Sequence, residues 1–244
     1  MINIRLIVEY DGTNYSGWQR QKNAMTIQEK LETSIKKATG SFSEVIGCSR
    51  TDAGVHARGF VCNFMTDSGI PPDNFKMVLN GILPCDIVVL DSMQVSESFH
   101  ARYNSIGKRY TYTIVTGKNK PAINRNYMYY FSRKLDFNNM KRSCGFFLGT
   151  HDFSAFKSSG SSVKTSVRTV KEFTVIQKGK FLVFDVVGDG FLYNMVRIMV
   201  GTVLEVGVGR FKPEDVKVIL DLKDRSKAGK PVPPMGLCLE KVFY

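Results

Sequence analysis

The residues best suited to chemistry in this chain lie in one short stretch, residues 47–59, with the sequence GCSRTDAGVHARG. It holds one carboxylate (Asp52), one imidazole (His56) and two guanidiniums (Arg50 and Arg58). Its three glycines mark backbone that must turn tightly or approach another group closely. A plain hairpin needs only Gly with Asn or Asp, so a connection of this length and charge indicates a carboxylate held in positive surroundings.

Asp52 is the candidate nucleophile of this stretch. An arginine within contact distance keeps a carboxylate ionised, and an ionised, oriented carboxylate can attack a substrate covalently. The competing interpretation is that Asp52 only caps a turn through an Asx-type hydrogen bond. The nearby Arg50, Arg58 and His56 favour the nucleophile.

Composition and charge narrow the class of protein. The chain has 244 residues, 43% of them hydrophobic and 23% charged, which is typical of one or two globular domains. A net charge of +12 favours a polyanionic partner, with nucleic acid before an anionic membrane. Five cysteines without a C-x-x-C pair indicate a reducing compartment. With no signal peptide and no apolar run of transmembrane length, we expect a cytoplasmic protein without a membrane partner.

Apolar periodicity predicts the elements that must position Asp52. The first half reads β-α-β-β-α-β, the ferredoxin-like split unit, with its elements at residues 2–10, 26–40, 45–46, 60–64, 73–81 and 86–90. The first helix begins at the capping box 26–29 and stops at Gly40. Asp52 then lies on the loop between the two middle strands.

The second half predicts the same order without repeating the sequence. Its expected elements are strands at 108–115, 167–176, 181–187 and 237–243, and helices from Asp136, at 191–201 and from Pro213 to Leu222. The predicted fold class is α+β, with two ferredoxin-like halves, 1–104 and 105–244, whose sheets lie side by side around a central basic cleft.

Several cofactor signatures are missing from the sequence. There is no P-loop, no complete G-x-G-x-x-G fingerprint, and no H-x-E with C-x-x-C of the zinc deaminases. The three histidines, at 56, 100 and 151, lie far apart and without cysteine pairs. We therefore expect no cofactor and no metal, and a reaction carried by side chains alone.

The stretch Arg50-Thr51-Asp52-Ala53-Gly54-Val55-His56-Ala57 resembles the signature of the tRNA pseudouridine synthase A family. Further segments fall in the family order across nearly the whole chain: 10–12, 17–21, 99–102, 151–156, 167–170, 195–197 and 234–237. Two departures are Cys48-Ser49, where Ala-Gly is commoner, and Tyr193-Asn194, where some members carry histidines. The first pair is small like its counterpart, so we expect no lost chemistry there.

The resemblance implies a reaction and roles for three residues, Asp52, Tyr110 and Arg197. Pseudouridine synthases break the N1–C1′ bond of a uridine, turn the base and rejoin it through C5, without a cofactor. Asp52 would be the nucleophile and would attack either ribose C1′ or uracil C6, while Arg50 is a catalytic candidate because it lies two positions before Asp52. Tyr110 would stack on the target base and help to remove the C5 proton, although a phenol is a weak base at neutral pH. Arg197 would pair with Asp52 across the two halves.

The resemblance also implies partners. The substrate would be tRNA, modified at uridines 38 to 40 of the anticodon stem-loop by a homodimer whose second subunit grips the RNA body. Side chains expected to contact RNA are Gln19, Arg20, His56, Arg58, His100, Arg102, Lys108, Arg109 and Tyr110.

Two other functions remain open at this point. A non-catalytic RNA-binding protein could use the same scaffold, but it has no use for a carboxylate facing phosphates. A metal-dependent nuclease would need two or more clustered acids, and the signature loop has one.

Overall fold

The computed structural model describes residues 1–160 and 164–244. It divides into two compact units: unit 1 is Met1–Ile106 with Cys238–Tyr244, and unit 2 is Gly107–Leu237. The sequence prediction divided the chain after residue 104 and assigned the C-terminal strand to the second half. The structure groups residues 238–244 with unit 1 instead, because strand pairing and not chain order decides where a terminal strand packs.

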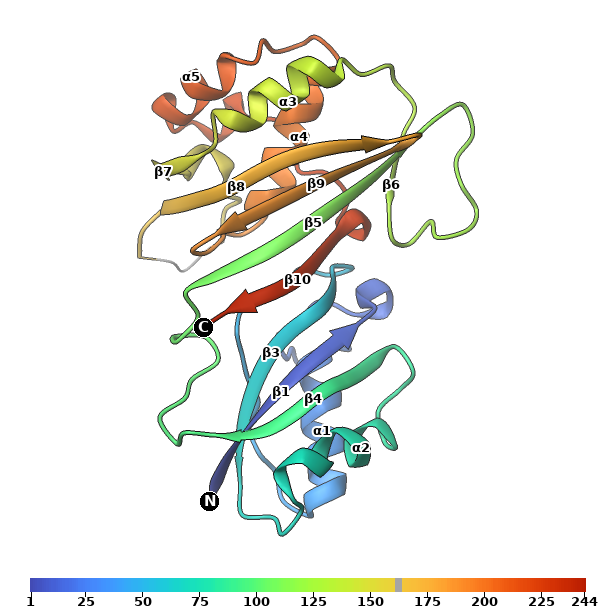
Figure 1. The fold of residues 1–244 in the computed structure, drawn as a ribbon, viewed down its shortest axis with the longest axis vertical. Helices are drawn as coiled ribbons and strands as arrows, with labels where there is room; N and C mark the ends of the chain where they lie inside the picture. Colours follow the sequence, from blue (N-terminus) through green and yellow to red (C-terminus); the bar gives the residue numbers. More distant parts are fainter. Residues whose placement is uncertain (161–163) are drawn as a thin grey trace. The chain divides into compact units, whose positions relative to one another are not determined.

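Unit 1 has a ferredoxin-like core (Figure 1). Its helices and strands are β1 (Ile2–Tyr10), α1 (Ile27–Thr39), β2 (Ile46–Gly47), β3 (His56–Thr66), α2 (Phe75–Asn80), β4 (Ile87–Val95) and β10 (Leu237–Phe243), with 3-10 turns at Gly12–Asn14 and Pro72–Asn74. β1 pairs antiparallel with both β3 and β4, and β2 pairs antiparallel with β3. The spatial order β4-β1-β3-β2 is that of the split β-α-β-β-α-β unit, which confirms the predicted fold class for this half.

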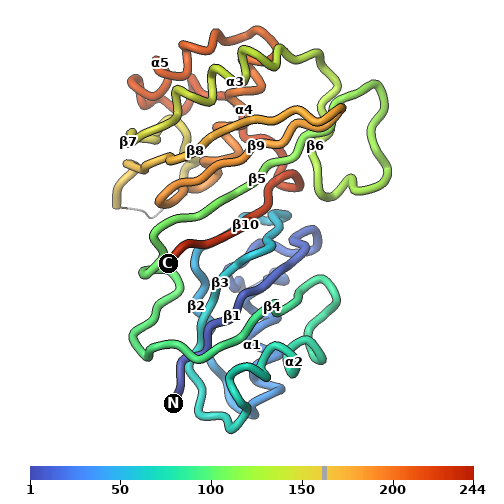
Figure 2. The backbone as a smooth tube through the Cα atoms, viewed as in Figure 1, coloured from blue at the N-terminus to red at the C-terminus, as the bar shows by residue number. Residues whose placement is uncertain are grey.

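β10 adds a strand on β3 that the ferredoxin-like order does not contain (Figure 2). It pairs in parallel with β3, Cys238 opposite His56 and Leu239 opposite Ala57. β3 begins directly after the loop that carries Asp52. The C-terminal strand therefore packs at the start of the strand that follows the signature loop.

Local sequence accounts for the first two elements of unit 1. Ile4, Leu6 and Val8 alternate along β1 and are fully buried on one face. The hydroxyl of Thr26 accepts the backbone N–H of Glu29 at 3.4 Å at the start of α1, and Gly40 ends the helix with φ 80°. The predicted helix start at Thr26 and the glycine stop are both confirmed, and the Thr26 half of the capping box is formed.

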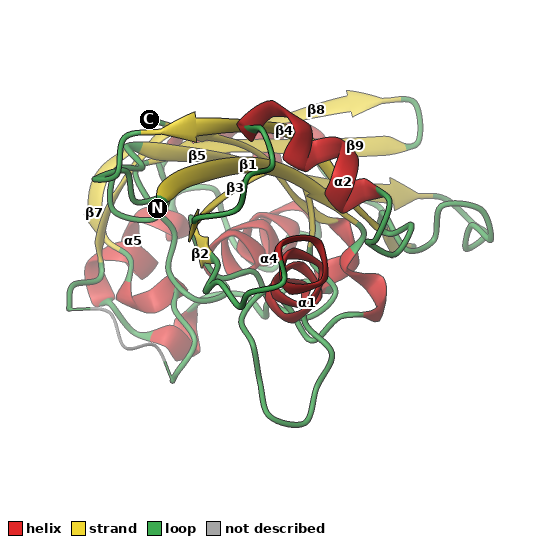
Figure 3. Ribbon diagram, turned by 90° about the horizontal axis from the view of Figure 1, so that it is seen from below, coloured by secondary structure: helices red, strands yellow, loops and turns green. Residues whose placement is uncertain are grey.

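Unit 2 contains an antiparallel sheet with the order β5-β9-β8-β7. Its helices and strands are β5 (Gly107–Thr116), β6 (Tyr129–Phe131), α3 (Phe137–Gly145), β7 (Gly149–Asp152), β8 (Val167–Lys178), β9 (Phe181–Gly188), α4 (Met195–Gly207) and α5 (Asp215–Leu222), with 3-10 turns at Ser154–Phe156, Arg225–Lys227 and Pro234–Gly236. β6 pairs in parallel with β5. α3 packs against β8 and α4, so that helices cover one face of the strands (Figures 1 and 3).

α4 differs from the predicted helix at both ends. The helix was expected over residues 191–201, but it begins at Met195 after Asn194, whose φ is 61°, and continues to Gly207. A left-handed residue cannot continue a right-handed helix backwards. Gly201 does not end the helix: a Cβ on it would lie 1.9 Å from the carbonyl oxygen of Lys230, so the glycine allows a second segment to approach the helix.

No helix among the described residues is both long and apolar enough to span a membrane.

Candidate functional site

The loop that carries Asp52 runs from Cys48 to Val55, between β2 and β3. The N–H of Cys48 donates to the carbonyl of Val61 at 2.9 Å, and the N–H of Val55 donates to the carbonyl of Asp52 at 3.2 Å. Gly54 lies in the left-handed region with φ 75°. The loop therefore closes as a tight turn with Asp52 at its start, and Asp52 itself is half-buried.

A second loop, residues 11–21, supports the first. Trp18 N–H donates to the Thr51 carbonyl at 3.2 Å, and Gly54 N–H donates to the Tyr15 carbonyl at 3.3 Å. The hydroxyls of Tyr10 and Thr51 lie 2.9 Å apart. These bonds reach Thr51 and Gly54, on both sides of Asp52, so the second loop holds the backbone of the Asp52 turn.

One close approach and a left-handed backbone explain why this supporting loop needs a glycine at position 17. A Cβ on Gly17 would lie 2.4 Å from the Thr51 carbonyl oxygen, and Gly17 has φ 88°. On the other side, Tyr15 donates its hydroxyl to Asp86 at 2.6 Å. Burial, together with this hydrogen bond, raises the pKa of the Tyr15 phenol.

Trp18 is part of the core of unit 1. Its indole is 3% exposed and stacks on Phe60, with 3.9 Å between ring centroids and 23° between planes. The indole also covers Gly47, where a Cβ would lie 2.6 Å from the ring. The ring thus packs against the last residue of β2, directly before the Asp52 loop, while the next two side chains, Gln19 and Arg20, are exposed.

The charged residues of the signature loop have different surroundings. The imidazole of His56 is buried, with Nδ1 3.1 Å from both the Gly12 N–H and an oxygen of Asp11. Arg58 is exposed and pairs with Glu240 on β10 at 2.6 Å. Arg50 is exposed, and within the described ranges its guanidinium forms no ion pair. His56 is therefore a scaffold residue in this structure, and Arg50 and Arg58 are the accessible cations of the loop.

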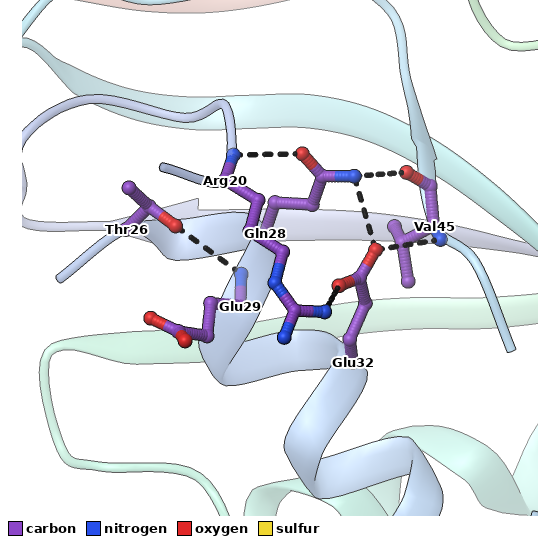
Figure 4. Close-up of polar contacts among 6 residues, drawn as sticks. All are labelled: Arg20, Thr26, Gln28, Glu29, Glu32 and Val45. Atoms are coloured by element: carbon purple, nitrogen blue, oxygen red, sulfur yellow. Dashed lines mark hydrogen bonds and ion pairs between the residues drawn. The ribbon is translucent and has the colours of Figure 1, made fainter. Parts of the chain in front are cut away.

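A buried acid that the sequence did not single out lies beside Arg20 (Figure 4). The carboxylate of Glu32 accepts hydrogen bonds from Arg20 Nη1 at 3.1 Å, Gln28 Nε2 at 3.0 Å and the Val45 N–H at 3.2 Å. Its signal in the sequence is an acid four residues after Gln28, next to the apolar stripe of the first helix. An acid at that spacing is usually solvated, which is why it passes unnoticed.

The link between the two predicted halves carries His100 and Arg102. Nδ1 of His100 accepts the N–H groups of Arg102 and Tyr103, each at 3.2 Å, and the imidazole lies 4.2 Å from the Tyr103 ring. The imidazole therefore orders this turn. The side chains of Arg102 and Tyr103 are exposed.

In unit 2, Tyr110 and its neighbours lie on β5. Tyr110 is 7% exposed and meets Phe191 edge to face, with 5.3 Å between ring centroids. Tyr112 is fully buried, and its hydroxyl donates to the Pro233 carbonyl at 2.7 Å; burial raises its pKa. Lys108 is buried, whereas Arg109 is exposed and makes a bidentate pair with Asp185 on β9. Of the two tyrosines, Tyr110 is the one with some exposed surface.

Arg197 is half-buried on the first turn of α4. Its Nε donates to the Val232 carbonyl and its Nη1 to Asn194 Oδ1, both at 2.7 Å. The N–H of Val232 in turn donates to the Arg197 carbonyl at 3.2 Å. The guanidinium is thus oriented by a segment 35 residues further along the chain.

Each unit gathers its own share of the predicted residues. Unit 1 holds Asp52 with Arg50, His56, Arg58, Gln19, Arg20, His100 and Arg102, and unit 2 holds Tyr110 with Lys108, Arg109 and Arg197. Among the residues that the structure describes, no three His, Cys, Asp or Glu side chains are placed to hold a metal ion.

Comparison with known proteins identifies the family. A family model described as tRNA pseudouridine synthase matches residues 6–104 and 144–244. Relatives named tRNA pseudouridine synthase A include those of Clostridium kluyveri, at 66% identity, and of Clostridium acetobutylicum and Acetivibrio thermocellus, each at 52%, all over the full length of both chains. The fold was also compared with solved structures. The match to a chain of a structure described as a Cbf5-Nop10-Gar1 complex covers 97% of this chain and 48% of that chain, at 11% sequence identity and a TM-score of 0.42. The chain therefore belongs to the tRNA pseudouridine synthase A family.

Proposed function

We propose that this protein isomerises uridine to pseudouridine in the anticodon stem-loop of tRNA, at positions 38 to 40, with Asp52 as the nucleophile. The substrate class follows from the names of the relatives, each called tRNA pseudouridine synthase A. The net charge of +12 suits a polyanionic substrate of this kind.

The observation that carries the proposal is the way in which the Asp52 loop is held. Both neighbours of the Asp52 turn are bound to a second loop: Thr51 by Trp18 and Tyr10, and Gly54 by Tyr15. A carboxylate that only capped a turn would need no such support. A nucleophile must be held close to its productive geometry, and a pre-ordered backbone provides that.

The reaction needs no oxidant, reductant or energy source. The N1–C1′ bond breaks, the uracil turns, a C5–C1′ bond forms, and the proton lost from C5 is balanced by one gained at N1. Asp52 attacks either ribose C1′ or uracil C6, and both alternatives keep the balance. The uridine must leave its stack to be reached, at a cost of a few kcal/mol, which contacts with the rest of the RNA offset.

Other residues have supporting roles in the proposal. Tyr110, with its small exposed edge beside Phe191, stacks on the displaced base and assists removal of the C5 proton. Arg197 keeps the role that the sequence resemblance implies, as the partner of Asp52, with Arg50 as a nearby cation. Gln19, Arg20, Arg58 and Arg102 have exposed side chains suited to RNA phosphates. We also propose the homodimer that the resemblance implies.

The test uses unmodified tRNA tritiated at uridine C5. Native protein should release tritium, and Asp52→Asn should release none while binding the tRNA with unchanged affinity, because only the nucleophilic oxygen is lost. Equal release by both proteins would place the nucleophile elsewhere. Binding without release by either protein would favour an RNA-binding protein without this activity.

A further inference from the structure

The Glu32 carboxylate of α1 is a buried charge that the proposed reaction does not use. Its side chain is 4% exposed, and it accepts three hydrogen bonds, from Arg20, Gln28 and the backbone of Val45 (Figure 4). Burying a carboxylate is costly even when it is paired, and an apolar side chain of the same volume often stabilises a fold better. A buried carboxylate is therefore a costly way to hold these segments together, and a role in binding would account for it.

The three donors come from three different segments. Arg20 belongs to the loop that holds the Asp52 turn through Trp18 and Tyr15. Val45 directly precedes β2, which leads into the Asp52 loop. Gln28 binds both neighbours as well, because its Oε1 accepts the Arg20 N–H at 3.0 Å and its Nε2 donates to the Val45 carbonyl at 3.1 Å. Glu32 and Gln28 thus join the two loops to one helix.

The Arg20 guanidinium is the one member of this cluster that faces solvent. Its side chain is 53% exposed, in contrast to the 4% of Glu32. A guanidinium has five N–H donors in a rigid fork, and within the described residues Glu32 is the side chain that binds it. An arginine held from behind by a buried carboxylate presents its other donors outward in a fixed orientation, which is the geometry that binds phosphate oxygens.

We propose that Glu32 is a positioning residue for RNA binding, whose buried carboxylate orients Arg20 toward a phosphate of the substrate RNA. The proposal rests on the proposed function, since it specifies how the same site holds its RNA. Gln28 has the secondary role of fixing the Arg20 backbone.

The direction of the change in RNA affinity on neutralising Glu32 distinguishes a positioning role from a purely electrostatic effect of its charge. Glu32 is negative, so its neutralisation should by itself strengthen the binding of a polyanion. If Glu32 orients Arg20, its neutralisation should instead weaken binding, because the guanidinium loses its fixed direction. The two explanations therefore predict opposite changes.

The experiment measures binding of an unmodified tRNA transcript to the full chain as a function of salt, together with KM and kcat for tritium release. Glu32→Gln should weaken binding about fivefold and raise KM by a similar factor, with kcat within twofold. The salt dependence should fall by ~0.7–0.9 log units in affinity per log unit of salt, the value of one lost phosphate contact. Glu32→Asp, which keeps the charge but withdraws it by one methylene, should weaken binding in the same direction and replaces the first variant if that one does not fold.

The matched control is Glu29→Gln, on the same helix. Glu29 is one turn away, and its carboxylate points away from the cluster in Figure 4. This variant loses the same charge and should bind tRNA as tightly as native protein or slightly more tightly. Equal binding by the Glu32→Gln and Glu29→Gln variants would overturn the proposal.

A double variant tests whether Glu32 acts through Arg20. Arg20→Ala should lower the affinity and the salt dependence by as much as Glu32→Gln, and the combined variant should show no further loss. Additive losses would mean that Glu32 acts independently of Arg20, and would contradict the proposal. These outcomes are measured as binding, so they stay distinct from a failure of the proposed reaction, which would appear as absent tritium release from native protein.

Discussion

Helices α1 and α4 have the same length but differ in how far they are buried and in how their N-termini are capped. Each has 13 residues, yet five residues of α1 are buried against eleven of α4. α1 begins at a side-chain cap, whereas the N-cap of α4, Asn194, makes no capping hydrogen bond from its side chain. A half-exposed helix depends on its ends, while a buried helix is stabilised by what packs around it.

Each of the two helices carries a charged side chain that bonds to the backbone of a distant segment, an acid on α1 and a base on α4. On α1, the acid Glu32 accepts the backbone N–H of Val45, and on α4, the base Arg197 donates to the backbone carbonyl of Val232. In each unit a charged helix residue thus fixes a distant stretch of irregular backbone. Such a bond satisfies a polar backbone group that the segment cannot satisfy itself.

The largest effect is expected from adding a side chain at Gly201, where a second segment of the chain approaches α4 closely. Gly201→Ala would place a Cβ 1.9 Å from the Lys230 carbonyl oxygen. We expect a loss of about 3 kcal/mol in the free energy of unfolding, since the backbone of the second segment must move and the gain in helix propensity is smaller. Urea denaturation measures the change.

The control for this variant is Gly145→Ala at the end of α3, where a Cβ would meet nothing within 4 Å. It should leave stability unchanged or raise it slightly. Alkylation of Cys144, a buried thiol whose pKa burial raises to about 12, should become faster in the Gly201→Ala variant, because it requires opening of unit 2. If alkylation stays as slow as in native protein, the strain does not reach α3.

A smaller loss of stability is expected from removing the guanidinium of Arg197. Arg197→Met keeps the side-chain volume but loses the bonds to Val232 and Asn194, and should cost about 2 kcal/mol of unfolding free energy. Lys217→Met on the exposed face of α5 is the control and should cost almost nothing. If both variants unfold alike, Arg197 does not stabilise the 230–232 segment.

The smallest effect concerns the cap of α1. Thr26→Ala removes the hydroxyl that accepts the Glu29 N–H and should cost about 1 kcal/mol. Thr33→Ala, an exposed position in the middle of the same helix, loses the same side chain and should be neutral or slightly stabilising. A loss at residue 33 equal to that at residue 26 would show that capping is not what α1 depends on.

Local chemistry made most of unit 1 predictable. The alternation in β1, the N-cap at Thr26 and the stop at Gly40 all depend on neighbours within four residues, and the structure agrees with each. The ends of α4 were wrong because they depend on distant groups: the left-handed Asn194, whose side chain bonds to Ser158 and Arg197, and the contact of Gly201 with Lys230. β6 and β7 were missed because three or four residues carry too little periodicity.

The same division applies to the candidate site. The sequence by itself determined the chemical groups and their loop, since Arg50, Asp52 and the glycines around them lie within a dozen residues, and it determined the family through the same stretch. Only the tertiary structure decided that His56 is buried, that Trp18 supports the loop, and that Glu32 lies behind Arg20. Those facts depend on contacts between segments far apart in the chain, and the close packing that sets them leaves no local trace in residue order.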